Sequence, residues 1–70
     1  MDRVYYIISE ILGIPLDEIN NGIEWDSLTH LHLILALEAE FGVSLPPEDI
    51  MTMLSVQQIQ IILRKHGVEV

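Results

Sequence analysis

One short stretch of the chain, "WDSLTHLH", brings together side chains that are able to do chemistry. It holds the carboxyl group of Asp26, the hydroxyl group of Ser27 and the imidazoles of His30 and His32. Carboxylates and imidazoles move protons or bind metal ions, whereas a hydroxyl acts as a nucleophile or as the point to which another group is attached. Which chemistry is available depends on how the backbone arranges these four residues.

Helical geometry argues against a metal site and against a nucleophilic enzyme. His30 and His32 are two residues apart and point about 200° away from each other on a helix, so they need ligands from elsewhere to share a metal ion. Ser27 and His30 could touch, but a catalytic serine also needs an oriented base, an oxyanion site and a pocket. A chain of 70 residues has little room for all three. An enzyme is therefore our third hypothesis.

Asp26 and Ser27 stand where a long helix is predicted to begin. We expect this helix over residues 27–41, because Asp26 can accept hydrogen bonds from the free amides of the first turn and Gly42 permits a left-handed exit. The amides and the positive end of the helix dipole would stabilise a phosphate attached to Ser27. On these two residues alone, a plain cap shared by Asp26 and Ser27 is the simpler interpretation.

Three further helices are predicted, and no segment shows the alternation of a strand. Apolar spacing and end signals place them at residues 3–12, about 47–53 and roughly 56–66. Asp2 is the expected cap of the first helix, and the loop that follows it should pack on the core, with one short turn at Asp17. The predicted fold class is all-α, a small four-helix bundle with a short third helix and a long loop between helices one and two. We expect a single domain over residues 1–70.

Charged residues at the predicted helix ends have a simple explanation. Glu48 and Asp49 follow two prolines at the start of the third helix, and Lys65 and His66 precede a glycine at the end of the fourth. Acids are favoured at the positive end of a helix and basic groups at its negative end. We interpret both pairs as helix-end charges.

The helix over residues 27–41 has an apolar face for the core and a second, smaller apolar pair. At 100° per residue, the arc between roughly 140° and 300° from Leu28 is the expected core face. That arc holds Leu31, Leu33, Ile34, Leu37 and Phe41. Leu28 and Leu35 point the other way, together with His32, and are either covered by the third helix or loop or exposed for a partner. Trp25 is expected to pack on the seam between the first and last helices.

Composition narrows the classes of ligand and partner. Three basic residues against eleven acidic ones give a net charge of −8, and the chain has no cysteine. This charge disfavours nucleic acid and anionic lipid and favours a partner with a basic patch. The absence of cysteine excludes disulfides and fits a reducing compartment. No apolar run is long enough to span a membrane. We expect a cytoplasmic monomer without membrane insertion.

The stretch "WDSLTHLHLILALEAEFGVSLPPEDI", residues 25–50, resembles the acyl carrier protein family. The hallmark of that family is Asp-Ser-Leu at the start of a long second helix that ends in Glu-x-Glu-Phe and Gly. A short third helix then begins after a proline, and a Ser/Thr-Val pair opens the fourth, as Ser55 and Val56 do here. The likeness extends helix by helix over nearly the whole chain.

The resemblance implies a carrier and not an enzyme. Ser27 would be the attachment point of 4′-phosphopantetheine, transferred from coenzyme A by a phosphopantetheinyl transferase, and Asp26 would be the supporting acid. The thiol of this arm would carry acyl or aminoacyl groups as thioesters. The implied partners are a loading ligase and downstream transferases or synthases of fatty-acid, polyketide or related specialised biosynthesis.

The resemblance also implies a docking surface, with departures from the common pattern. Leu28, Leu35, His32, Glu38 and Glu40 match positions at which carriers meet partner enzymes. Housekeeping fatty-acid carriers have acids one turn into the second helix, where this chain has Thr29 and His32. The approach "IEWDSL" also differs from Gly-Ala-Asp-Ser-Leu and from the Gly-Gly-x-Ser-Leu of nonribosomal peptide carriers. The chain is most similar to a stand-alone specialised carrier.

A second function is compatible with the same residues. An unmodified acidic helical module could dock a partner through Leu28 and Leu35, with Ser27 serving only as part of a cap. In that case Ser27→Ala would leave function intact.

Overall fold

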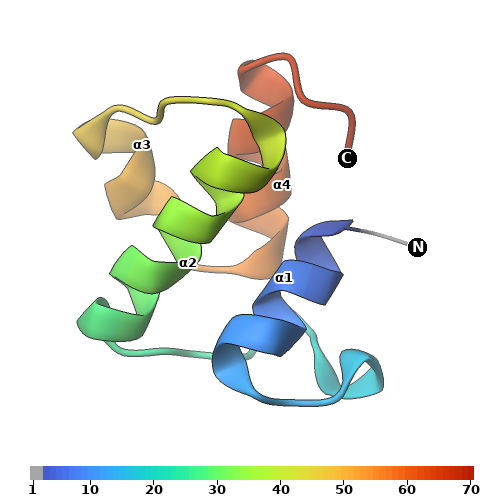
Figure 1. Cartoon of the computed structure of the whole chain (residues 1–70). Coiled ribbons are helices and arrows are strands. Elements are labelled where there is room, and N and C mark those ends of the chain that lie inside the picture. The colour runs from blue at the N-terminus through green and yellow to red at the C-terminus, as the bar shows by residue number, and fades with distance from the viewer. Residues whose placement is uncertain (1–2) are drawn as a thin grey trace.

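Four α-helices and one short 3-10 turn make up the regular structure of residues 3–70, the residues described by a computed structural model (Figure 1). They are α1 (Arg3–Leu12), η1 (Leu16–Glu18), α2 (Ser27–Phe41), α3 (Pro47–Thr52) and α4 (Val56–Lys65). No strand occurs within these residues, which confirms the all-α class. Within the same range, none of the helices has the length and apolar character needed to cross a bilayer.

Helix boundaries follow the local signals closely. Asp26 caps α2 by accepting from the Thr29 amide at 2.8 Å, and Gly42 ends the helix with φ of 65°. The Ser55 hydroxyl caps α4 by accepting from the Gln58 amide at 3.2 Å. α3 ends one residue earlier than predicted, as does α4, whose last carbonyls accept from the His66 amide. The cap predicted at Asp2 lies outside the described residues.

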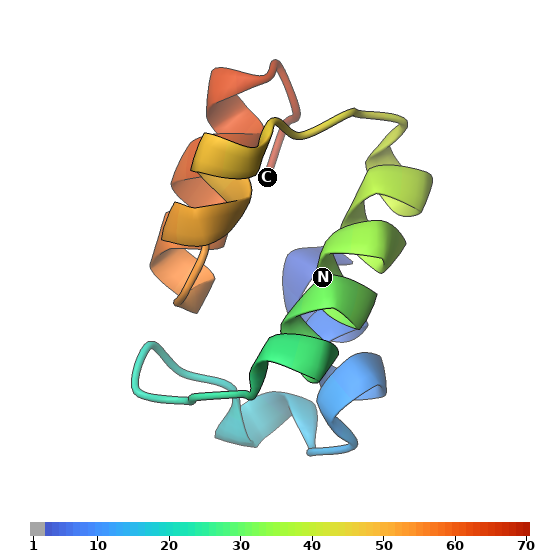
Figure 2. The ribbon, with the colours of Figure 1, turned by 90° about the vertical axis from the view of Figure 1, so that its left-hand side faces the viewer.

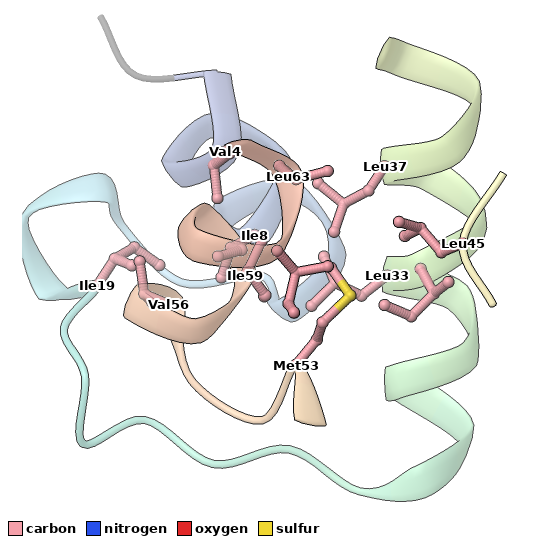
Figure 3. Close-up of a cluster of buried hydrophobic side chains, with 12 residues drawn as sticks. Val4, Ile8, Ile19, Leu33, Leu37, Leu45, Met53, Val56, Ile59 and Leu63 are labelled. Atoms are coloured by element: carbon pink, nitrogen blue, oxygen red, sulfur yellow. The ribbon is translucent and has the colours of Figure 1, made fainter. Parts of the chain in front are cut away.

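The core is a cluster of aliphatic side chains from α1, α2 and α4, closed by residues before and after α3. Its fully or nearly fully buried members are Val4, Ile8, Ile19, Leu33, Ile34, Leu37, Leu45, Met53, Val56, Ile59, Ile62 and Leu63. Figure 3 shows these side chains pointing toward one another between the helices. Burial of apolar surface on this scale supplies most of the stability of a small domain.

The long loop before α2 is fastened to the bundle at both ends. The Ser9 hydroxyl donates to the Ile14 carbonyl at 2.6 Å, and Ile19 is buried in the core. Farther along, the Asn21 side chain accepts from the Gln57 amide at 2.8 Å in the first turn of α4. In Figure 2 this loop passes below α4 and then turns into α2. The prediction of a packed loop with one short turn at Asp17 is confirmed by η1.

A buried carboxylate connects α3 to the end of α4. Asp49 is only 5% exposed, and its two oxygens accept from Lys65 Nζ and His66 Nε2, each at 2.7 Å. Hydrogen bonding from Lys65, and secondarily from His66, lowers the pKa of Asp49. The helix-end interpretation of these three charges is therefore incomplete, because the fold pairs them with one another across 16 and 17 residues of chain.

The far end of α2 is also held by charged groups. Arg3 pairs with Glu40, and its guanidinium lies 5.6 Å from the centre of the Phe41 ring. Glu38 Oε2 accepts from the Leu45 amide at 2.8 Å. These contacts fix the exit of α2 and the segment that leads into α3.

We predict that Asp49→Asn destabilises the protein in a pH-dependent way. The folded-state pKa of Asp49 lies below the usual value of 3.8, so its stabilisation is present above that pH and is lost as the pH falls through the folded value. Urea unfolding should show a lower free energy of unfolding for the variant at pH 7, and this difference should shrink as the pH falls below the usual pKa of an aspartate, 3.8.

The control is Glu48→Gln, an exposed acid on the same helix, which should leave stability almost unchanged. A gap between the wild type and Asp49→Asn that stays constant over the whole pH range would contradict the ion-pair explanation.

Candidate functional site

Ser27 is the first residue of α2, and its side chain faces solvent. Within residues 3–70 its hydroxyl has no hydrogen-bond partner. The first turn of an α-helix leaves amide groups without intrahelical acceptors, and the helix dipole adds positive potential there. The hydroxyl is therefore accessible, unengaged and in a place that favours a negatively charged substituent.

Asp26 alone provides the cap of this helix. Its carboxylate accepts from the Thr29 amide, and hydrogen bonding from Thr29, first through its side chain and then through its backbone, lowers the pKa of Asp26. The carboxylate is thus charged at neutral pH, directly beside the serine. The shared-cap interpretation was wrong for Ser27, whose hydroxyl is left with no structural task.

A chain of two hydrogen bonds braces the approach to the serine. Trp25 Nε1 donates to His30 Nδ1 at 2.8 Å, and His30 Nε2 lies 2.8 Å from the carbonyl oxygen of Ile50 in α3. The two rings are nearly parallel, with 15° between their planes and 6.2 Å between centroids. Because the indole can only donate, Nδ1 must be the acceptor and Nε2 must bear the proton that bonds Ile50. We call this the Trp25–His30–Ile50 bridge.

The bridge changes one expectation. Both nitrogens of His30 are engaged by Trp25 and Ile50, so His30 is not placed to activate Ser27. The indole N–H of Trp25 bonds within this bridge, while the ring packs against the core cluster; its place on the seam between the first and last helices stays a prediction. No group of three or more His, Asp or Glu side chains in residues 3–70 is arranged to hold a metal ion.

The outward face of α2 is more apolar than the sequence predicted. Leu28 and Leu35 are 65% and 63% exposed, so neither α3 nor the loop covers them. Leu31 was expected in the core but is 56% exposed. The buried side chains of α2 span only about 140° to 240°, and Leu31, near 300°, lies beyond the last of them. With His32, also exposed, these three leucines form what we call the leucine face.

The two acids predicted for docking lie at the other end of α2 and serve the fold. Glu38 is half-buried and bonds the Leu45 amide, and Glu40 pairs with Arg3. They lie about one turn beyond Leu35, the last member of the leucine face. Neither is a free surface charge.

Sequence reasoning missed the role of His30, although one signal pointed to it. On the helical wheel His30 falls at about 200°, in the middle of the buried arc, where an imidazole needs partners for both nitrogens. The partners themselves, a tryptophan five residues earlier and a carbonyl twenty residues later, could be found only from the fold.

Comparison with protein families gives one match that spans most of the chain. A family model described as "Phosphopantetheine attachment site" matches residues 2–60. The matched segment includes Ser27, Asp26 and all of α2 and α3.

We predict that His30→Ala destabilises the protein by about 1–3 kcal/mol, because it leaves the Trp25 indole and the Ile50 carbonyl without their partner. Urea unfolding followed by circular dichroism measures this loss, and the emission of Trp25 should shift as its hydrogen bond is removed. The matched control is His32→Ala on the exposed face of the same helix, which should change stability by less than ~0.5 kcal/mol. Equal effects of the two substitutions would refute the bridge.

Proposed function

The chain belongs to the phosphopantetheine attachment site family, and on that premise we propose that Ser27 is the residue that bears the arm. Members of this family are non-catalytic carriers that receive 4′-phosphopantetheine covalently from a phosphopantetheinyl transferase. The chain is therefore a phosphopantetheine-bearing carrier protein and not an unmodified interaction module.

A comparison of the four serines supports Ser27. Ser9 donates to the Ile14 carbonyl, and Ser55 caps α4. Ser44 is exposed but lies in the linker between α2 and α3. Only Ser27 combines an exposed, unengaged hydroxyl with the start of a long helix, where a phosphodiester is stabilised by free amides and the helix dipole.

In the proposed modification, Ser27 Oγ forms a bond to the phosphorus that bears the pantetheine in coenzyme A and loses its proton. The bond from that phosphorus to the nucleotide half breaks, and the nucleotide departs with the second phosphate. Asp26, charged and adjacent, helps to orient the serine and to hold the metal ion of the transferase. We assign Asp26 this supporting part because its capping bond keeps the carboxylate fixed beside Ser27.

When attached, the arm supplies a terminal thiol that carries acyl or aminoacyl groups as thioesters. This explains thiol chemistry in a chain without cysteine. We propose that a loading ligase places the group on the arm and that transferases or synthases of a fatty-acid, polyketide or related pathway remove it.

We further propose that these partners dock on the leucine face. Leu28, Leu35 and His32 share the outward side of α2 beside Ser27, and no acid occurs in residues 27–37. Apolar contact is therefore the main source of affinity at this surface, while the net charge of −8 steers partners with basic surroundings from a distance. Glu40 and Glu38 lie at the far end of the helix. Their role in docking is limited, because Glu40 is paired with Arg3 and Glu38 is bonded to the Leu45 amide.

We predict that incubation with coenzyme A, magnesium and a broad-specificity transferase adds one phosphopantetheine group to the chain, as measured by intact mass. Ser27→Ala should abolish the addition, because no other serine is both free and at a helix start. Ser44→Ala is the control, since it removes an equally exposed hydroxyl elsewhere. No addition to the wild type, or addition to the Ser27→Ala variant, would refute the assignment.

We predict that Leu35→Glu lowers kcat/KM for arm transfer by the same transferase about tenfold or more, because a charge replaces an apolar contact near the modified serine. Leu35 is exposed, so circular dichroism should show an unchanged fold. Ile61→Glu is the matched control, an exposed apolar residue on α4. If both variants react as the wild type does, the leucine face is not where the transferase binds.

A further inference from the structure

The approach to Ser27, residues 24–26, is fastened to α2 by the polar groups of its side chains. Neither of its first two residues makes a backbone–backbone hydrogen bond in the described part of the chain. The indole of Trp25 donates to His30 Nδ1 at 2.8 Å, and the carboxylate of Asp26 caps the helix. The course of the backbone just before the serine therefore depends on two side-chain bonds.

The bond between Trp25 and His30 closes a short loop around the serine. These two residues are five apart in the chain, and Asp26 and Ser27 lie between them. The capping bond from the Thr29 amide to Asp26 closes a smaller loop inside the first. With both loops closed, rotation about its side-chain bonds is the main freedom left to the hydroxyl of Ser27.

The orientation of the imidazole in this loop is set by α3. His30 Nε2 lies 2.8 Å from the carbonyl oxygen of Ile50, which can only accept, and the indole of Trp25 can only donate. One neutral tautomer of His30, with its proton on Nε2, satisfies both partners. The ring is half-buried, and the bond to Ile50 keeps Nδ1 turned toward Trp25 as an acceptor.

Transfer of the arm is sensitive to this bracing, because Ser27 Oγ has to approach the phosphorus in line with the bond that breaks. In the step proposed above, Oγ bonds to the phosphorus and loses its proton while the nucleotide half departs with the second phosphate. A misplacement of about 1 Å in such a step can cost about a hundredfold in rate. Since the hydroxyl has no hydrogen-bond partner within residues 3–70, the backbone fixes where it stands.

We propose that His30 is a positioning residue for transfer of the arm: it accepts the N–H of Trp25 and so holds Ser27 where Oγ can attack. This inference rests on the proposed attachment at Ser27. His30 points about 160° around α2 from Leu28, away from the leucine face. Its replacement should therefore change kcat for the transfer and leave KM almost unchanged.

Two substitutions separate the two bonds of His30. The side-chain oxygen of His30→Asn reaches the place of Nδ1 and can accept from Trp25, but this side chain is too short for Ile50. The amide nitrogen of His30→Gln reaches the place of Nε2 and can donate to Ile50, but it leaves the indole unpaired. Each variant loses one bond, so a merely structural role would affect both alike.

We predict that His30→Gln lowers kcat for transfer of the arm about tenfold, with KM for the carrier within about twofold of the wild type. His30→Asn should recover kcat to within about threefold of the wild type. Coenzyme A, magnesium and a broad-specificity transferase are used, and intact mass follows the reaction where circular dichroism shows a folded chain. The emission of Trp25 should shift in His30→Gln and stay in place in His30→Asn.

Trp25→Phe removes the same bond from its other end and keeps an aromatic ring. It should lower kcat as His30→Gln does, and the double variant should be no slower than either single variant, because all three lose one bond. Wild-type kcat in His30→Gln, an equal loss in His30→Asn, or multiplied losses in the double variant would overturn the inference.

Trp25→Phe also decides the matter where a variant of His30 does not fold, because wild-type kcat in Trp25→Phe would overturn the inference by itself. A wild-type chain that accepts no arm would instead refute attachment at Ser27, and the positioning role with it.

Discussion

The region around the serine depends on one polar ring placed on the buried side of α2. His30 lies where an aliphatic residue would be expected, and the imidazole is tolerated there because Trp25 and Ile50 satisfy both of its nitrogens. The same two bonds join three parts of the chain, the last of them twenty residues beyond His30. The loop before α2, the first turns of α2 and the short α3 thereby become one braced unit.

This brace matters most for α3, which is too short to be stable as an isolated helix. It is tied to α2 through the Ile50 carbonyl, and its buried Asp49 is tied to α4 through Lys65 and His66. Polar contacts of defined geometry, rather than a broad apolar face, therefore position this helix. Leu54, which follows it, lines an open pocket together with Glu24 and Trp25.

Local signals in the sequence were sufficient to predict where the helices begin and end. A cap such as Asp26 and a left-handed glycine such as Gly42 each act within a single turn of helix. The proposed role of the hydroxyl beside that cap rests on its family pattern and stays a prediction. What could not be predicted depends on tertiary neighbours. Leu31 sits at the margin of the core arc, where only the actual packing decides whether a side chain is covered.

The same limit applies to charged residues. Asp49 suits a helix start on local grounds, yet its partners come from the end of α4. Glu38 resembles a docking acid by position, yet it accepts a backbone amide seven residues away. The sequence alone does not show which hydrogen-bond donor the fold will place beside a given carboxylate.

The free hydroxyl of Ser27 determines whether its modification would break contacts within the fold. Since it bonds to nothing within residues 3–70, replacing its proton by a phosphodiester breaks no internal contact. The modification that we propose at Ser27 therefore requires no internal hydrogen bond to be broken. Under that proposal, a partner enzyme would distinguish the two forms by the added group itself and not by a rearranged scaffold.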